Sequence, residues 1–305
     1  MGPVRECDYD RVQNTEIKSV FTLFPCVIVP FVPAVIALAF AWRSLWTDRK
    51  KTDASINIIF GMQLLVETIF GALCWGVCLW FKGAGKYMGG EAMCAFQGWT
   101  VAFYCFAQPV MLSLVCVAGY SWALHGASSR FTPKTLIVLS SSVLLFAGLL
   151  AILPLFGWGH YAMPSLYCTL DFQDTPFTML WLATFVLLCS CLFYGPVRMV
   201  FAAVRGTSRL RSKLVLASGF VAIHSASVWS VVVFIAIDGL ASGSPWQCQI
   251  SNNYRDIFGL AAFLCHWQQL VNPLMLTVWW RREISAMVDK SAQMEKNVQI
   301  EEASH

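Results

Sequence analysis

Charged residues are scarce in this chain: Asp, Glu, Lys and Arg together make up 12% of its 305 residues, about half their usual share in soluble domains. The chain also lacks a glycine-rich phosphate loop, a set of His, Cys and Asp residues at metal-binding spacing, and a nucleophile with an evident base and orienting acid. These absences predict that the protein is not an enzyme and has no resident metal.

Long apolar runs take the place of the missing charge. They cover residues 19–42, 54–81, 92–129, 135–170, 176–197, 214–237 and 257–280. Each is at least as long as the roughly 20 residues that a helix needs to cross a bilayer, and the two longest must include polar loop at their ends. The sequence therefore predicts an all-α membrane protein, a seven-transmembrane helix bundle at 19–280.

Lysine and arginine are distributed unevenly between the two sides of these runs. Most lie in the connections at 43–51, 130–134 and 198–213 and in the tail, whereas the opposite connections hold Arg5, Arg11, Lys18, Lys82, Lys86 and Arg255. By the positive-inside rule, we expect residues 1–18 to be extracellular and the tail 281–305, with a short amphipathic helix at 282–294, to be cytoplasmic. The polar N-terminal segment predicts no cleavable signal peptide.

The net charge of +4 then reflects membrane topology rather than nucleic-acid binding, because the basic residues gather on one side of the bilayer. We expect a multi-pass protein of the plasma membrane whose partners include the lipid bilayer and no nucleic acid.

Most of the twelve cysteines lie inside the predicted helices, where cysteine behaves as a small buried hydrophobe. Four others, Cys7, Cys94, Cys168 and Cys248, fall on the predicted outer face, which is oxidising at a cell surface. A disulfide between Cys94 and Cys168 would pin the loop after the fourth helix across the outer mouth of the bundle. Cys7 and Cys248 form the remaining pair, or stay as free or differently partnered thiols.

Several short motifs carry a family resemblance. They are Pro-Leu-Phe-Gly-Trp-Gly-His-Tyr at 154–161, Tyr-Cys-Thr-Leu-Asp at 167–171, Phe-Gln-Gly at 96–98, Asn-Pro at 272–273, and Asn57 and Glu67 ten positions apart. Together they resemble the rhodopsin-like (class A) G-protein-coupled receptors, and among these the animal opsins of the retinal G-protein-coupled receptor, or retinochrome-like, branch. The resemblance implies a receptor with an outward-opening ligand pocket, capped by the loop of Cys168, and a cytoplasmic face that engages heterotrimeric G proteins.

The chain departs from the opsins at the retinal site. Opsins hold retinal as a Schiff base on a lysine six residues before the Asn of Asn-Pro, and that position here is His266. No lysine lies inside any apolar run, and an imidazole cannot form a Schiff base. The sequence therefore excludes covalent retinal and predicts no cofactor. The usual counterion position is the neutral Gln97, as expected where no buried cation needs balancing.

The signalling motifs of the family are also incomplete. Where these receptors have Asp-Arg-Tyr at the cytoplasmic end of the third helix, this chain has Ala118, Gly119 and Tyr120. The Asn-Pro-x-x-Tyr motif of the seventh helix ends in Leu276. The resemblance implies contact with a G protein, and these residues leave coupling open.

Glu67 lies in the middle of an apolar run, where a charge is costly and usually protonated, paired or functional. One interpretation is an ion or proton site shared with Asn272; the other is a protonated carboxyl that holds the bundle together through Gln269 or Asn272. His224 and His266 either sense protons near neutral pH or stay as neutral, hydrogen-bonded imidazoles.

The sequence thus predicts an atypical rhodopsin-like receptor that binds a small apolar or amphipathic ligand noncovalently and transmits a conformational signal to the cytoplasm. The expected pocket is lined by Gln97, Ala102, Cys105, Phe106, Trp181 and His266. One alternative is a non-signalling seven-helix membrane scaffold or chaperone-like protein, which the loss of the Asp-Arg pair favours. Another is a proton-linked sensor or transporter built on Glu67, His224 and His266, which the absence of internal repeats counts against.

Overall fold

The computed structural model describes residues 29–74, 90–125, 131–159, 161–162 and 169–170, helical positions between 179 and 204, and residues 268, 270–286, 288, 289, 293, 297 and 300. The long helices are α2 (Val29–Thr47), α3 (Ala54–Thr68), α5 (Gly90–His125) and α6 (Pro133–Ile152). Shorter segments extend the bundle: the π-helix η2 (Ile69–Cys74), the 3-10 helix η4 (Leu153–Phe156) and the π-helix η5 (Pro273–Trp280).

These helices coincide with the predicted apolar runs. In the described part of the chain, three helical stretches are long and apolar enough to cross a membrane, namely Ala54–Gly71, Glu91–Trp122 and Pro133–Phe156. The described positions between 179 and 204 are helical as well. The predicted sixth run, 214–237, lies outside the described residues. The protein is an α-helical, multi-pass membrane protein.

Local sequence signals account for several helix boundaries. The side chain of Asp53 accepts a hydrogen bond from the backbone N–H of Ser55 at 2.7 Å and so caps the start of α3. Thr132 caps α6 in the same way, and Pro133 occupies the first turn, where its missing N–H costs nothing. Gly157 ends η4 with φ 87°, a left-handed conformation that glycine adopts without strain.

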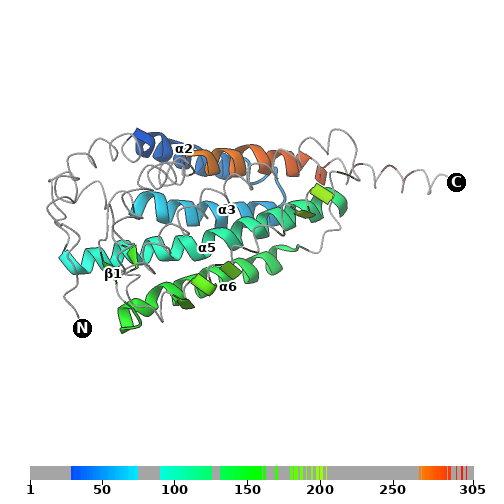
Figure 1. Ribbon diagram of the computed structural model, residues 1–305. Helices are drawn as coiled ribbons and strands as arrows, with labels where there is room; N and C mark the ends of the chain where they lie inside the picture. The colour runs from blue at the N-terminus through cyan, green and yellow to red at the C-terminus, as the bar shows by residue number, and fades with distance from the viewer. Residues whose placement is uncertain are drawn as a thin grey trace, which may run out of the picture.

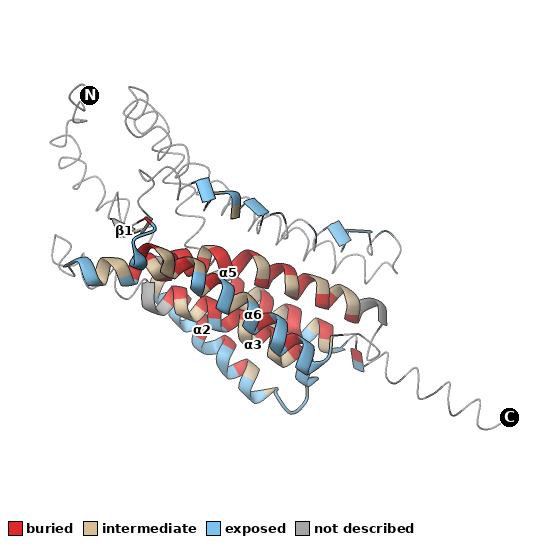
Figure 2. Ribbon diagram, turned by 90° about the horizontal axis from the view of Figure 1, so that it is seen from below, coloured by how far each residue is buried: buried red, intermediate tan, exposed pale blue. Residues whose placement is uncertain are grey.

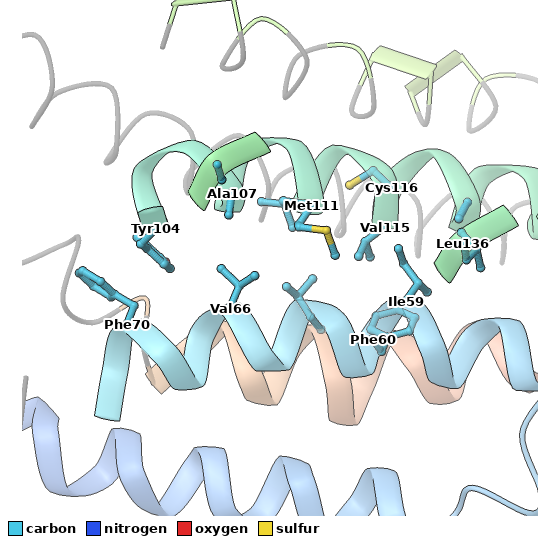
Figure 3. Close-up of a cluster of buried hydrophobic side chains, with 14 of the residues drawn as sticks. Ile59, Phe60, Val66, Phe70, Tyr104, Ala107, Met111, Val115, Cys116 and Leu136 are labelled. Carbon is cyan, nitrogen blue, oxygen red and sulfur yellow. The ribbon is translucent and has the colours of Figure 1, made fainter. Parts of the chain in front are cut away.

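The helix α5 lies at the centre of the described bundle. It packs against α3, α6 and two short strands at residues 161–162 and 169–170, while α2 packs against α3 and η5 (Figure 1). Buried residues follow α5 along its length (Figure 2). Val66 and Phe60 of α3 and Met111 and Val115 of α5 belong to one buried cluster between the two helices (Figure 3).

The outer surface of the bundle is apolar. On α6, residues such as Ile137, Leu145 and Phe146 are exposed although they are large and hydrophobic. A surface of this kind is unfavourable in water and favourable in lipid, which is what a membrane-spanning helix requires.

The structure adds a short β-pairing to the predicted all-α architecture. The strands β1 (Tyr161–Ala162) and β2 (Thr169–Leu170) pair antiparallel against α5, with Tyr161 opposite Leu170. Two-residue strands are too short for sequence periodicity to reveal.

The helix that contains η5 also continues further than predicted. Arg281 has helical dihedral angles, and residues 281–286 are helical. The predicted tail helix at 282–294 therefore continues directly from η5 instead of starting a separate element. No glycine or proline lies between Leu274 and Ala286, so nothing in the sequence interrupts the helix there.

Candidate functional site

A buried carboxylate in the middle of the bundle collects hydrogen bonds from three helices. Glu67 Oε1 accepts from Gln63 Nε2 at 3.1 Å, from Gln108 Nε2 at 2.6 Å and from Asn272 Nδ2 at 2.8 Å. The Tyr104 hydroxyl donates to Glu67 Oε2 at 3.4 Å. All five side chains are at most 2% exposed, and we call them the Glu67 cluster. The structure thus brings together Glu67 and Asn272, which the sequence analysis had paired.

The cluster has more acceptor oxygens than its own donors occupy. Gln63 Nε2 also donates to Gln108 Oε1 at 2.8 Å, but the carbonyl oxygens of Gln63 and Asn272 accept no hydrogen bond from the described residues. Buried acceptors are normally satisfied. Two such oxygens beside a carboxylate are the ligands that a proton or a small hard cation prefers.

The backbone is irregular where the cluster lies. The π-helix η2 begins at Ile69, two residues after Glu67, and η5 begins at Pro273, directly after Asn272. In α5, Pro109 follows Gln108 and has no N–H to donate to the carbonyl of Cys105. Short π-helical segments inside α-helices occur frequently at functional sites.

Tyr161 of β1 packs near the N-terminal end of α5. Its hydroxyl donates a hydrogen bond to the backbone carbonyl of Ala151 on α6. Its ring stands directly over Gly98 of α5, because a Cβ at Gly98 would lie 2.2 Å from Tyr161 Cδ1. Only glycine allows this approach.

The predicted ligand-pocket residues on α5 lie inside the bundle. Gln97, Ala102 and Phe106 are at most 3% exposed. Cys105 is half-buried. The other two predicted pocket residues, Trp181 and His266, lie outside the described residues, as does His224.

Cys94, near the start of α5, is disulfide-bonded. Its predicted partner Cys168 and the second predicted pair, Cys7 and Cys248, lie outside the described residues. Cys105, inside α5, is not disulfide-bonded.

Toward the C-terminal end of α5, the residues that align with the receptor family's Asp-Arg-Tyr motif are covered. Ala118 is fully buried. A Cβ at Gly119 would lie 3.0 Å from Ile284 Cδ1 and 3.2 Å from Trp280 Nε1. Tyr120 is half-buried, and the Arg198 guanidinium carbon lies 5.4 Å from its ring centroid.

Sequence reasoning missed one buried charge. Arg281 is 0% exposed, although the charge pattern of the sequence groups it with the cytoplasmic basic residues. It donates to Asn57 Oδ1 at 2.9 Å, to the Ser44 carbonyl at 3.1 Å and to Asp48 Oδ2 at 3.2 Å, and its Nε donates to the Thr277 carbonyl at 3.0 Å. Burial lowers the pKa of Arg281 and Asp48 opposes that shift, but arginine remains charged in proteins.

No family model matches this sequence, and no curated protein matches it. Solved structures do: 548 chains match. One of them is the crystal structure of squid rhodopsin, with a TM-score of 0.56 and 14% sequence identity over 89% of this chain and 85% of that chain. At this identity the likeness concerns the fold alone. The chain has a rhodopsin-like fold.

Proposed function

We propose that the protein is an atypical rhodopsin-like G-protein-coupled receptor that binds a small apolar or amphipathic ligand noncovalently and transmits a conformational signal across the plasma membrane. In this proposal the bundle has seven transmembrane helices, the N-terminus is extracellular, and Cys168 is the disulfide partner of Cys94. The rhodopsin fold and the opsin-like motifs support the assignment.

The observation that carries the proposal is the contact of Tyr161 with the outer end of α5. Tyr161 of β1 stands over Gly98, and its hydroxyl donates a hydrogen bond to the backbone carbonyl of Ala151 on α6. Buried side chains of α5 beneath a covering aromatic ring are the arrangement expected for a site that encloses an apolar ligand. Gln97 is the polar side chain that would orient such a ligand.

The Glu67 cluster supports the second half of the proposal. It joins α3, α5 and the helix of η5 through one carboxylate. A proton or cation held there would favour one relative arrangement of the three helices over another, and a polar network of this kind is a two-state element that a ligand can bias.

Thermal stability in lipid nanodiscs tests the ligand site. The purified full chain would be screened with retinoids, fatty acids and other small apolar compounds, and we expect a bound ligand to raise the melting temperature. Ala102→Leu should abolish that rise because it fills the proposed pocket. Ala37→Leu is the control, since both alanines are 3% exposed and carry a similar overpacking cost. A rise that survives Ala102→Leu unchanged would place the ligand elsewhere.

A non-signalling scaffold remains the second candidate, because Gly119 presents no side chain and lies under Trp280 and Ile284. Nucleotide exchange on a panel of G proteins, measured at equal surface expression, separates the two candidates. Ligand-driven exchange supports the receptor, and its absence for every G protein supports the scaffold.

A further inference from the structure

The cytoplasmic end of α5 is packed against the chain's own helical extension. Trp280, Ile284 and Val288 are at most 8% exposed and share one buried cluster with Ala118 and Trp122 of α5. The spacing of the three residues, four positions apart, places them on one face of a helix. We call residues 280–288 the cytoplasmic cover.

Gly119 lies in close contact with two residues of the cover. A Cβ there would lie 3.0 Å from Ile284 and 3.2 Å from Trp280, whereas a Cβ at Gly148 of α6 would have nothing within 4 Å. The missing side chain at position 119 therefore has a local structural reason: it leaves space for the cover.

Arg281 ties the cover to the other side of the bundle. It follows Trp280 in the chain and reaches Ser44 and Asp48 near the end of α2, and Asn57 of α3. The neighbouring Arg282 also approaches Asp48, at 3.4 Å, but its side chain is 59% exposed against 1% for Arg281. The two adjacent arginines thus carry the same charge and share Asp48 as a partner, but Arg281 is buried and Arg282 is exposed.

The anchoring of Arg281 is an all-or-none arrangement. A buried guanidinium is stable while its acceptors are in place, and it is costly once they are lost, so the side chain must then leave for water or the lipid headgroups. Because Arg281 lies between Trp280 and Ile284 on a continuous helix, its departure would loosen both residues from α5.

We propose that residues 280–288 form an autoinhibitory cover over the cytoplasmic end of α5, anchored by Arg281, and that a cytoplasmic transducer reaches Ala118–Trp122 once the cover is released. The transducer part rests on the proposed receptor function; the anchored cover does not. The cover accounts for the absence of the arginine at position 119, because the chain itself occupies the space.

Cysteine accessibility tests the cover in the full chain in nanodiscs. Ile284→Cys and Ala286→Cys place thiols two residues apart, one at a 0% exposed position and one at an exposed position. With a charged, water-soluble thiol reagent and peptide mass mapping, we expect slow labelling at 284 and fast labelling at 286, since reaction at a buried thiol waits for local opening. Equal rates at the two positions would overturn the cover.

The anchor is tested in the Ile284→Cys background. Arg281→Gln should speed labelling at 284 by about tenfold or more, the change in opening expected from losing a charged hydrogen bond. Arg282→Gln should leave the rate within about twofold, because exposed ion pairs contribute little. Asp48→Asn, which weakens the same anchor without altering the helix, should act in the direction of Arg281→Gln and covers the case in which that variant does not fold. No acceleration from either anchor variant overturns the role of Arg281.

Nucleotide exchange then separates the cover from the receptor proposal. If basal exchange rises in Arg281→Gln and not in Arg282→Gln, the cover is autoinhibitory. If the unmodified chain and Arg281→Gln drive equal exchange while labelling at 284 differs, the inhibitory role is wrong. If neither drives exchange although labelling is faster, the cover stands and the proposed G-protein coupling fails.

Discussion

Two glycines of α5 give space to aromatic side chains from other segments. Gly98 lies under Tyr161 near the N-terminal end of the helix, and Gly119 lies under Trp280 and Ile284 near its C-terminal end. A glycine inside a helix is less stable than alanine by about 0.5–1 kcal/mol. The close contacts above each glycine offset that cost. Each glycine stabilises the fold because it lets a side chain from another segment pack against α5.

We expect Gly98→Ala to destabilise the protein by about 1–3 kcal/mol, because the new methyl group overlaps the ring of Tyr161. Gly148→Ala is the matched control and should be neutral or slightly stabilising, since its Cβ meets nothing within 4 Å. Thermal melting in nanodiscs measures both. Adding Tyr161→Ala should remove most of the effect of Gly98→Ala; additive effects would mean that the two residues do not interact.

Glu67 is the acceptor for three amide donors, and its replacements should differ accordingly. Glu67→Leu should cost about 3 kcal/mol or more, because buried donors on three helices lose their acceptor. Glu67→Gln keeps one oxygen in place and should cost about 1 kcal/mol. Melting at equal surface expression compares the two variants.

The same pair of variants tests the proton or cation site. If the unmodified chain melts at a temperature that depends on sodium concentration or pH, Glu67→Gln should remove that dependence while keeping most of the stability. A dependence that persists in Glu67→Gln would show that the ion binds elsewhere.

At the scale of elements, the π-helix η5 determines which residues face α3. Asn272 and Arg281 are nine positions apart, about two and a half turns of a regular α-helix, which would place them on opposite faces. Hydrogen bonds in a π-helix join residues five positions apart instead of four, so each turn contains more residues. Both side chains therefore reach α3: Asn272 contacts Glu67 and Arg281 contacts Asn57.

Asn57 forms hydrogen bonds with the turn between α2 and α3 and with Arg281. Its Nδ2 donates to the carbonyls of Arg49 and Thr52, each at 3.1 Å, and its Oδ1 accepts from Arg281. Asn57→Ala should cost about 2 kcal/mol, since it leaves a charged donor without one acceptor. Asn57→Asp retains that acceptor and should cost less. Thermal melting compares the stability of the two variants. Equal losses of stability would mean that the hydrogen bond between Arg281 and Asn57 contributes little.

For the whole molecule, the fold of rhodopsin occurs together with a sequence that has no lysine in its apolar runs. The described bundle is held by an apolar core between α3, α5 and α6 and by two polar tethers, the Glu67 cluster and Arg281.

Reconstitution with retinal checks the absence of a Schiff base. We expect neither a red-shifted visible pigment nor an adduct trapped by borohydride, because no amine lies inside the apolar runs. A combined His266→Lys and Gln97→Glu variant would supply the amine and its counterion, and it serves as the positive comparison. A stable covalent pigment in the unmodified chain would show that the helix register assigned to His266 is wrong.

The sequence alone determined the membrane class of the protein and the approximate position of the described helices. Apolar length is a local property, and a bilayer requires every spanning segment to satisfy its own backbone hydrogen bonds. The pairing of Glu67 with Asn272 could also be predicted from the sequence, because an acidic residue in an apolar run needs a polar partner.

Only the tertiary structure decided the remaining partners of the cluster, the position of Tyr161 over Gly98, and the burial of Arg281. Nothing in the sequence marks Gln63, Tyr104 and Gln108 as partners of Glu67. The packing of α3 on α5 places them around it. Arg281 is buried because η5 departs from the α-helical repeat, and hydrophobic periodicity read with a repeat of 3.6 residues cannot show that departure.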